Sequence, residues 1–228
     1  MQTPTIKAVA DCAVLVTFAD KVSKDANQTV IACDKAIQSA AITGVIESVP
    51  ALVNVMVVFD PSVTTHSQVS NAILKLFPLP SNQSAQTATH VFDVYYDIAV
   101  GPDLDAVATA CGLSHEAVIN AHTSAEYTAS MYGYAPGYAY LTGVPQALQV
   151  PRKDAPVRNI PKGSVMIAGP QCLVTTLVMP TGWSILGYTN AAIMRDDPND
   201  PFLIKVGDKV RFRRAGPEVL PHQLADRG

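Results

Sequence analysis

Residues 132–145 of the chain read Tyr132-Gly133-Tyr134-Ala135-Pro136-Gly137-Tyr138-Ala139-Tyr140-Leu141-Thr142-Gly143-Val144-Pro145. These fourteen residues hold four tyrosines, three glycines and two prolines. Proline fixes φ at roughly −65° and glycine accepts positive φ, so the central Ala-Pro-Gly predicts a tight turn with Pro136 second and Gly137 third. The flanking tyrosines would present flat apolar faces tipped by a hydroxyl. Such a bend suits either the wall of a ligand pocket or a corner of the core.

Short motifs on both sides of this stretch follow one another in a fixed order. Upstream lie Gly101-Pro102-Asp103-Leu104, Gly112-Leu113-Ser114 and His122-Thr123. Downstream lie Val150-Pro151-Arg152, Pro156-Val157-Arg158, Ile160-Pro161-Lys162-Gly163-Ser164-Val165, Ile167-Ala168-Gly169-Pro170-Gln171 and Pro180-Thr181-Gly182-Trp183-Ser184-Ile185-Leu186-Gly187. Their order and spacing resemble the B-type family of bacterial 5-oxoprolinase subunits. That family is also described as allophanate hydrolase subunit 1, as the Kip-type kinase inhibitor, and as carboxyltransferase subdomains C and D.

The resemblance implies a cyclophilin-like barrel and a role as the B subunit of an ATP-dependent, multi-subunit hydrolase of the 5-oxoprolinase type, acting on an amide or lactam. In that scheme a C-type subunit shares the catalytic site and a separate A-type subunit then completes the reaction. ATP would act in the complex, and the isolated chain would be inactive. Two alternatives stay open: the carboxyltransferase half of a biotin-dependent urea carboxylase or allophanate system, and a non-enzymatic inhibitor of a sensor histidine kinase.

The chain departs from the family pattern at several positions. The Gly-Gly-Glu expected ahead of Gly101 is absent, Cys172 stands where many members carry threonine, and Tyr188 replaces an arginine. Losing a glutamate and an arginine changes the charges that a substrate meets. This fits a divergent branch that acts on a different amide or lactam.

Composition indicates a globular chain. Apolar residues make up 48% of the chain and charged residues 15%, as in globular proteins. The length of 228 residues is enough for one large or two modest domains. The net charge of −3, without a basic stripe, argues against a nucleic-acid partner. The apolar runs are too short to span a bilayer and the amino terminus lacks a signal-peptide pattern, so we expect no membrane partner and a cytoplasmic location. The four cysteines show no C-x-x-C spacing, and no metal site is expected.

The pattern of apolar residues predicts an α+β chain with two domains. Residues 1–81 would form a small α/β sandwich-like domain, in the order β-α-β-β-α. Its strands are expected at 12–18, 45–49 and 52–59, and its helices at 23–41 and after a capping box of Thr65 and Gln68. The polar stretch 81–89 reads as a linker.

Residues 90–228 would form a cyclophilin-like β-barrel domain. We expect a strand at 91–96 and helices at 102–111 and 115–121, the second with Ser114 as its N-cap. Short apolar runs then indicate strands at 157–160, 165–168, 173–178, 184–188, 203–206 and 210–213, with a hairpin turn at 205–210. Many short strands at such spacing favour a closed or nearly closed barrel.

His122 is the catalytic candidate. It follows a predicted helix and matches the family's His-Thr position, where an imidazole could carry protons near neutral pH. The alternative is a histidine that binds the last carbonyls of that helix.

Eight residues are candidates for substrate binding. Guanidinium and ammonium groups among the prolines would bind a carboxylate or phosphate, or else acidic residues of a partner. The amide of Gln171 suits a planar amide or lactam, or a structural hydrogen bond. The set is Tyr134, Pro136, Gly137, Tyr138, Arg152, Arg158, Lys162 and Gln171. Cys172 is expected to be buried and inert, and Trp183 to serve in packing.

Overall fold

The computed structural model describes residues 4–79 and 87–221. The chain divides into two compact units, residues 1–86 and 87–228. Most of the predicted linker, the first predicted domain boundary at residue 81 and the two ends of the chain lie outside the described residues.

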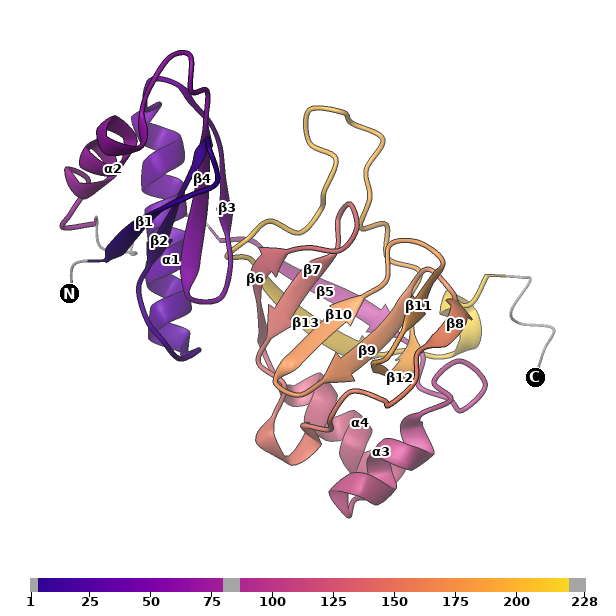
Figure 1. The fold of residues 1–228 in the computed structure, drawn as a ribbon. Helices are drawn as coiled ribbons and strands as arrows, with labels where there is room; N and C mark the ends of the chain where they lie inside the picture. The colour runs from indigo at the N-terminus through magenta and orange to yellow at the C-terminus, as the bar shows by residue number, and fades with distance from the viewer. Residues whose placement is uncertain (1–3, 80–86, 222–228) are drawn as a thin grey trace. The chain divides into compact units, whose positions relative to one another are not determined.

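The first unit is a four-stranded antiparallel sheet with the order β1-β2-β4-β3 and two helices (Figure 1). Its elements are β1 (Thr5–Val9), β2 (Ala13–Thr17), α1 (Lys24–Ala40), β3 (Val45–Pro50), β4 (Asn54–Phe59) and α2 (His66–Leu74). Alternate residues of β2 and β4, such as Val14 and Val57, form one core with α1 and α2. The strand β1 was missed by the predicted order because four of its five residues are exposed.

Helix ends in this unit follow the predicted capping chemistry. Ser23 caps α1 by accepting from the Ala26 N–H at 3.1 Å. Thr65 and Gln68 form a complete capping box at the start of α2, which confirms the prediction. Each cap satisfies backbone N–H groups that have no partner in the first turn of a helix.

The second unit is built on a seven-stranded sheet with the order β12-β9-β10-β7-β6-β13-β5. Its strands are β5 (Thr89–Val94), β6 (Tyr127–Tyr132), β7 (Ala139–Thr142), β9 (Ser164–Ala168), β10 (Gln171–Val174), β12 (Ser184–Tyr188) and β13 (Lys209–Arg214). The helices α3 (Leu104–Cys111) and α4 (His115–Ser124) lie at one end of this sheet, and β8 (Val157–Ile160) pairs with β11 (Met179–Thr181) beside it (Figure 1).

The two outer strands of this sheet meet, so the sheet curls into a nearly closed barrel. Tyr95, directly after β5, exchanges two backbone hydrogen bonds of 2.8 and 2.9 Å with Tyr188 of β12. The close approach requires Gly187, where an added Cβ would lie 2.5 Å from the Tyr95 carbonyl oxygen. The structure confirms the predicted fold class, a mixed α and β chain with a small first unit and a barrel after it.

Before Tyr188, backbone groups at the β12 edge bond to the motif Gly101-Pro102-Asp103 rather than to a strand. The Asp103 N–H donates to the Ile185 carbonyl at 3.2 Å, and the Asp103 carboxylate accepts from the Ile185 N–H at 2.8 Å. Gly101 lies so close to Leu186 that a Cβ would be 2.2 Å from its carbonyl oxygen. Backbone groups at a buried sheet edge need such partners.

The barrel strands separate two apolar clusters. All seven strands contribute to the interior core, together with α3 and α4; Ile167, Cys172 and Leu186 belong to it. The residues between them, such as Ala168, Leu173 and Ile185, belong to an outer core under β8 and β11. Side chains of a strand alternate between its two faces, and β10 shows this directly.

Two predicted strands need correction, and two strands of this sheet were not predicted. Residues 203–206 form no strand, because Leu203 bonds back to Ile193 and the following residues turn around Asp208. The predicted strand 173–178 ends at Val174. The strands β6 and β7 were not predicted, because β6 reads YTASMY, with few strongly apolar residues, and β7 has only four residues.

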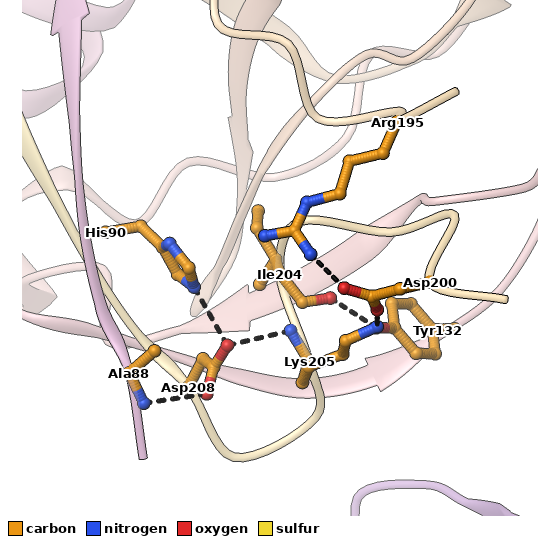
Figure 2. A network of polar contacts seen from close by, with 8 residues as sticks. All are labelled: Ala88, His90, Tyr132, Arg195, Asp200, Ile204, Lys205 and Asp208. Carbon is orange, nitrogen blue, oxygen red and sulfur yellow. Dashed lines mark hydrogen bonds and ion pairs between the residues drawn. The ribbon is translucent and has the colours of Figure 1, made fainter. Parts of the chain in front are cut away.

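The predicted hairpin turn at 205–210 is present as a turn, since the Asp208 N–H donates to the Lys205 carbonyl at 3.0 Å. It joins no hairpin, because residues 203–206 form no strand, and it is an anchored entry into β13 (Figure 2). The buried Asp208 carboxylate accepts from the N–H groups of Ala88 and Lys205 at 3.0 and 2.9 Å and contacts His90 Nε2 at 2.8 Å. It therefore ties the starts of the parallel strands β5 and β13 together. The neighbouring Asp200 pairs with Arg195 and Lys205.

Gly137 provides a test of the turn. Gly137 and Gly112 have similar φ, +69° and +64°, but a Cβ would lie 2.5 Å from Met194 Sδ at Gly137 and in open space at Gly112. We expect Gly112→Ala to lower the free energy of unfolding by about 1 kcal/mol through backbone strain alone. Gly137→Ala should cost about 1 kcal/mol more, because the Met194 side chain must move and Phe202 and Thr176 also lie within 3.4 Å of the added Cβ. Urea denaturation measures both, and equal losses would contradict the packing described around Gly137.

Candidate functional site

The tyrosine-rich stretch is the hairpin between β6 and β7. The Tyr138 N–H donates to the Ala135 carbonyl at 3.1 Å, and Gly137 has φ +69°, so Pro136 and Gly137 occupy the predicted turn positions. The Thr176 hydroxyl donates to the Pro136 carbonyl at 2.8 Å and fixes the turn to the segment between β10 and β11. The turn is thus held from outside as well as by its own sequence.

Four rings form a continuous row beside this turn, which we call the aromatic row. Ring centroids are 5.5 Å apart for Tyr134–Tyr138, 5.5 Å for Tyr138–Tyr140 and 5.8 Å for Tyr140–Trp183. Tyr138 and Trp183 are buried, whereas Tyr134 is 68% exposed. The row therefore runs from the outer core to the surface.

Tyr134 is held in an unusual backbone conformation. Its φ is +69°, a left-handed value that costs a residue with a large side chain about 1 kcal/mol or more. Residues with such strained backbone angles cluster at active sites and ligand sites. The exposed end of the aromatic row is therefore a place where a ligand or a partner would make contact.

Arg152 lies against the buried part of the row. A Cβ on Gly182, the residue before Trp183, would be 3.8 Å from Arg152 Nε and 3.9 Å from Nη2. Burial raises the pKa of the Tyr138 and Tyr140 phenols, and the positive charge of Arg152 opposes that rise. Arg152 is exposed and forms no ion pair with any described residue. Its guanidinium is available for an anion.

Gln171 lies on the same outer face of the sheet. In register it stands between Thr142 of β7 and Ala168 of β9, and Ala168 belongs to the outer core. Its Nε2 is buried and, among the described side chains, is the only such atom without a hydrogen-bond partner. A buried unpaired donor costs about 1–3 kcal/mol. The amide is therefore ready to donate to an acceptor that the chain itself does not supply.

His122 lies on the opposite face, inside the barrel. It is in the last turn of α4, is fully buried, and its Nδ1 is 2.8 Å from the Tyr96 hydroxyl. Its Nε2 is 3.6 Å from the Cys172 thiol, and its ring stacks on Phe212 at 4.7 Å. The structure therefore does not bring His122 together with the aromatic row. Nor does the ring bind the carbonyls of its own helix.

Burial dominates the electrostatics of this interior cluster. It lowers the pKa of His122 to about 3, so the imidazole is neutral at physiological pH. Burial also raises the pKa of the Cys172 thiol well above its usual range, so the thiol stays protonated. A catalytic role for His122 stays a prediction, and this position argues for a packing role instead.

The two other predicted cations lie on the β8 side of the outer core. Arg158 is in β8 and Lys162 lies two residues after its end, and both are exposed. Neither forms an ion pair with a described residue. The structure therefore groups Tyr134, Tyr138, Arg152 and Gln171 on one face, with these cations at the neighbouring ribbon.

The predicted set of substrate-binding residues left out Tyr140, although it is one of the flanking tyrosines, and sequence reasoning missed the ion pair of Lys153 with Asp103. Tyr140 completes the aromatic row, and the pair fixes the segment next to Arg152. The alternation of Tyr138 and Tyr140 in the sequence was the available signal for the first. Among residues 4–79 and 87–221, no group of three metal-ligating side chains exists and no helix is long and apolar enough to cross a membrane.

Comparison with known proteins identifies the family. The family model of the carboxyltransferase domain, subdomain C and D, matches residues 4–204. The chain belongs to this family. It is 32% identical over 221 residues to the B subunit of 5-oxoprolinase from Bacillus subtilis (strain 168), a match that covers 92% of each chain.

Two solved structures share the fold. One is TTHA0988, with a TM-score of 0.80 and 32% identity over 92% of this chain; the match spans only 41% of that longer chain. The other is the K. lactis urea amidolyase, with a TM-score of 0.74 and 15% sequence identity. That match spans 94% of this chain and 15% of the length of the urea amidolyase chain. The second likeness concerns the fold alone.

The neutral imidazole of His122 predicts a pH dependence. The pKa of His122 is about 3 in the folded chain and 6.5 for an ordinary histidine, so the unfolded chain takes up this proton at a higher pH than the folded chain does. The free energy of unfolding therefore falls as the pH drops from 6.5 towards 3. Between about pH 7.5 and about pH 5 the loss should be about 2 kcal/mol. His122→Gln should remove this component, which urea denaturation of both proteins at the two pH values would measure. Equal pH dependence of the two would contradict a neutral, buried His122.

Proposed function

We propose that the chain is the B-type subunit of an ATP-dependent lactam or amide hydrolase of the 5-oxoprolinase type. The name of the Bacillus subtilis relative, whose match spans nearly the whole of both chains, supports this reading. The observation that carries it is chemical. An unpaired guanidinium, a row of aromatic rings and a buried amide donor without a partner lie on one face of the sheet.

These groups match the parts of a cyclic amide that carries a carboxylate. The Arg152 guanidinium would bind the carboxylate through paired hydrogen bonds. The rings of Tyr138 and Tyr140 would lie beside the flat ring of the substrate. Gln171 Nε2 would donate to the lactam oxygen, which gives the orphaned donor its acceptor. Each of these interactions orients the substrate, and none breaks the amide.

The candidate residues that the structure groups on this face supply no general base beside the aromatic row. The tyrosine phenols there are protonated, since burial raises the pKa of both Tyr138 and Tyr140. His122 and Cys172 lie inside the barrel. We therefore place the proton-transfer groups on a C-type partner that shares the site, with an A-type protein completing the reaction. ATP belongs to that complex and not to this chain alone.

A second candidate is the carboxyltransferase half of a biotin-dependent urea carboxylase or allophanate system. The description of the matching family model, carboxyltransferase domain, subdomain C and D, favours it. In that case Arg152 would bind a carboxyl group in transfer from biotin. Incorporation of labelled bicarbonate into a biotinylated carrier separates this reaction from lactam hydrolysis.

The proposal includes a cytoplasmic location. All four cysteines are free, including Cys12 and Cys111, which are partly exposed. Free thiols persist in reducing compartments.

Replacing Arg152 tests the substrate contact. In the reconstituted complex, Arg152→Ala should lower kcat/KM for 5-oxoproline by about 10- to 150-fold, since a charged hydrogen bond contributes about 1.5–3 kcal/mol. The matched control is Arg213→Ala, which removes an exposed arginine paired with Asp93 elsewhere on the barrel. Equal losses in both variants, or no loss in either, would remove Arg152 from the site.

Reconstitution tests the shared site itself. Co-expression with a C-type and an A-type protein of the same system should give a stable complex that hydrolyses ATP in the presence of 5-oxoproline, allophanate or urea. Size-exclusion chromatography and phosphate release measure these properties. A chain that stays apart from both proteins, or that shows lactam hydrolysis alone, contradicts the shared site.

A further inference from the structure

Asp103 does not behave as an ordinary N-cap residue. It precedes α3, where aspartate usually accepts from a backbone N–H of the first turn, yet its side chain makes no cap hydrogen bond. One carboxylate oxygen, Oδ2, instead accepts from the Ile185 N–H at 2.8 Å and from Lys153 Nζ at 2.5 Å. Asp103 therefore does not cap α3 but joins the edge strand β12 to the loop that carries Lys153.

Lys153 is fixed at both its backbone and its side chain. Its N–H donates to the Gly182 carbonyl at 2.7 Å, and its ammonium pairs with Asp103. The two side chains are 22% and 17% exposed, so water screens this pair less than a surface pair. The segment 152–153 is therefore held between the β12 edge and the residue before Trp183.

The anchoring of Lys153 restricts the position of the neighbouring residue, Arg152. An arginine side chain has many rotamers, and a free guanidinium would sample many positions. Here its Nε and Nη2 lie close to Gly182, on the side of Tyr138 and Tyr140. A backbone that is held on the next residue restricts where the guanidinium can lie.

We propose that the Asp103–Lys153 ion pair is a positioning device for Arg152, which it holds beside the aromatic row for an anionic group of the substrate. Lys153 and Asp103 are positioning residues and touch no substrate. The role in substrate binding rests on the proposed function, but the restriction of Arg152 does not.

Arg152 can be observed without any substrate. In a protein labelled with nitrogen-15, the Nε–Hε resonance of Arg152 is assigned by its disappearance in Arg152→Lys. We expect it to be ordered in the native chain, disordered in Lys153→Met, and ordered again in Lys153→Arg, which keeps the ion pair. Lys205→Met is the matched control, since it breaks a lysine–aspartate pair outside the site and should leave the resonance unchanged. An Arg152 resonance whose order is the same in Lys153→Met would overturn the proposal.

Kinetics of the reconstituted complex then test the link to function. Lys153→Met should raise KM for 5-oxoproline about 3- to 10-fold with kcat unchanged, and should have no further effect in an Arg152→Ala background. Independent, multiplying effects of the two substitutions would overturn the positioning role. A disordered Arg152 resonance with unchanged KM would leave the ion pair as a restraint on Arg152 and contradict the proposed carboxylate contact. The two failures are thus distinguishable.

Discussion

Side chains on a β-strand point alternately to its two faces, and this constraint determines which residues of the barrel can act together. In β10, Cys172 faces the interior and contacts His122, whereas Gln171 and Leu173 face outwards with the aromatic row. The interior cluster is neutral and sealed. The outer face carries the unpaired amide of Gln171 and the free guanidinium of Arg152. One sheet thus separates a structural core from a face with unsatisfied polar groups.

Closure of the barrel connects this face to the rest of the unit. The Tyr95–Tyr188 pair joins the outer strands, and Asp103 serves as a short substitute for a strand along β12. The same carboxylate also binds Lys153, so the Asp103 side chain holds both the β12 edge, where the barrel closes, and the loop that carries Arg152. Fold and site are therefore coupled through a single side chain.

Local patterns in the sequence were sufficient for features that depend on a few adjacent residues. The turn at Pro136 and Gly137 and the capping box of Thr65 and Gln68 follow from backbone preferences alone. The side of the sheet on which His122 lies could not be predicted, because it depends on the register of strands far apart in the sequence. The Asp103–Lys153 pair joins residues 50 positions apart, and no spacing rule reveals it.

A crystal structure of the reconstituted complex with bound 5-oxoproline tests the central claim most directly. The account predicts that the ligand lies on the outer face of the barrel, with its lactam oxygen on Gln171 Nε2 and its carboxylate on the Arg152 guanidinium. A ligand bound against His122 inside the barrel, or one that leaves Gln171 Nε2 unpaired, would contradict it.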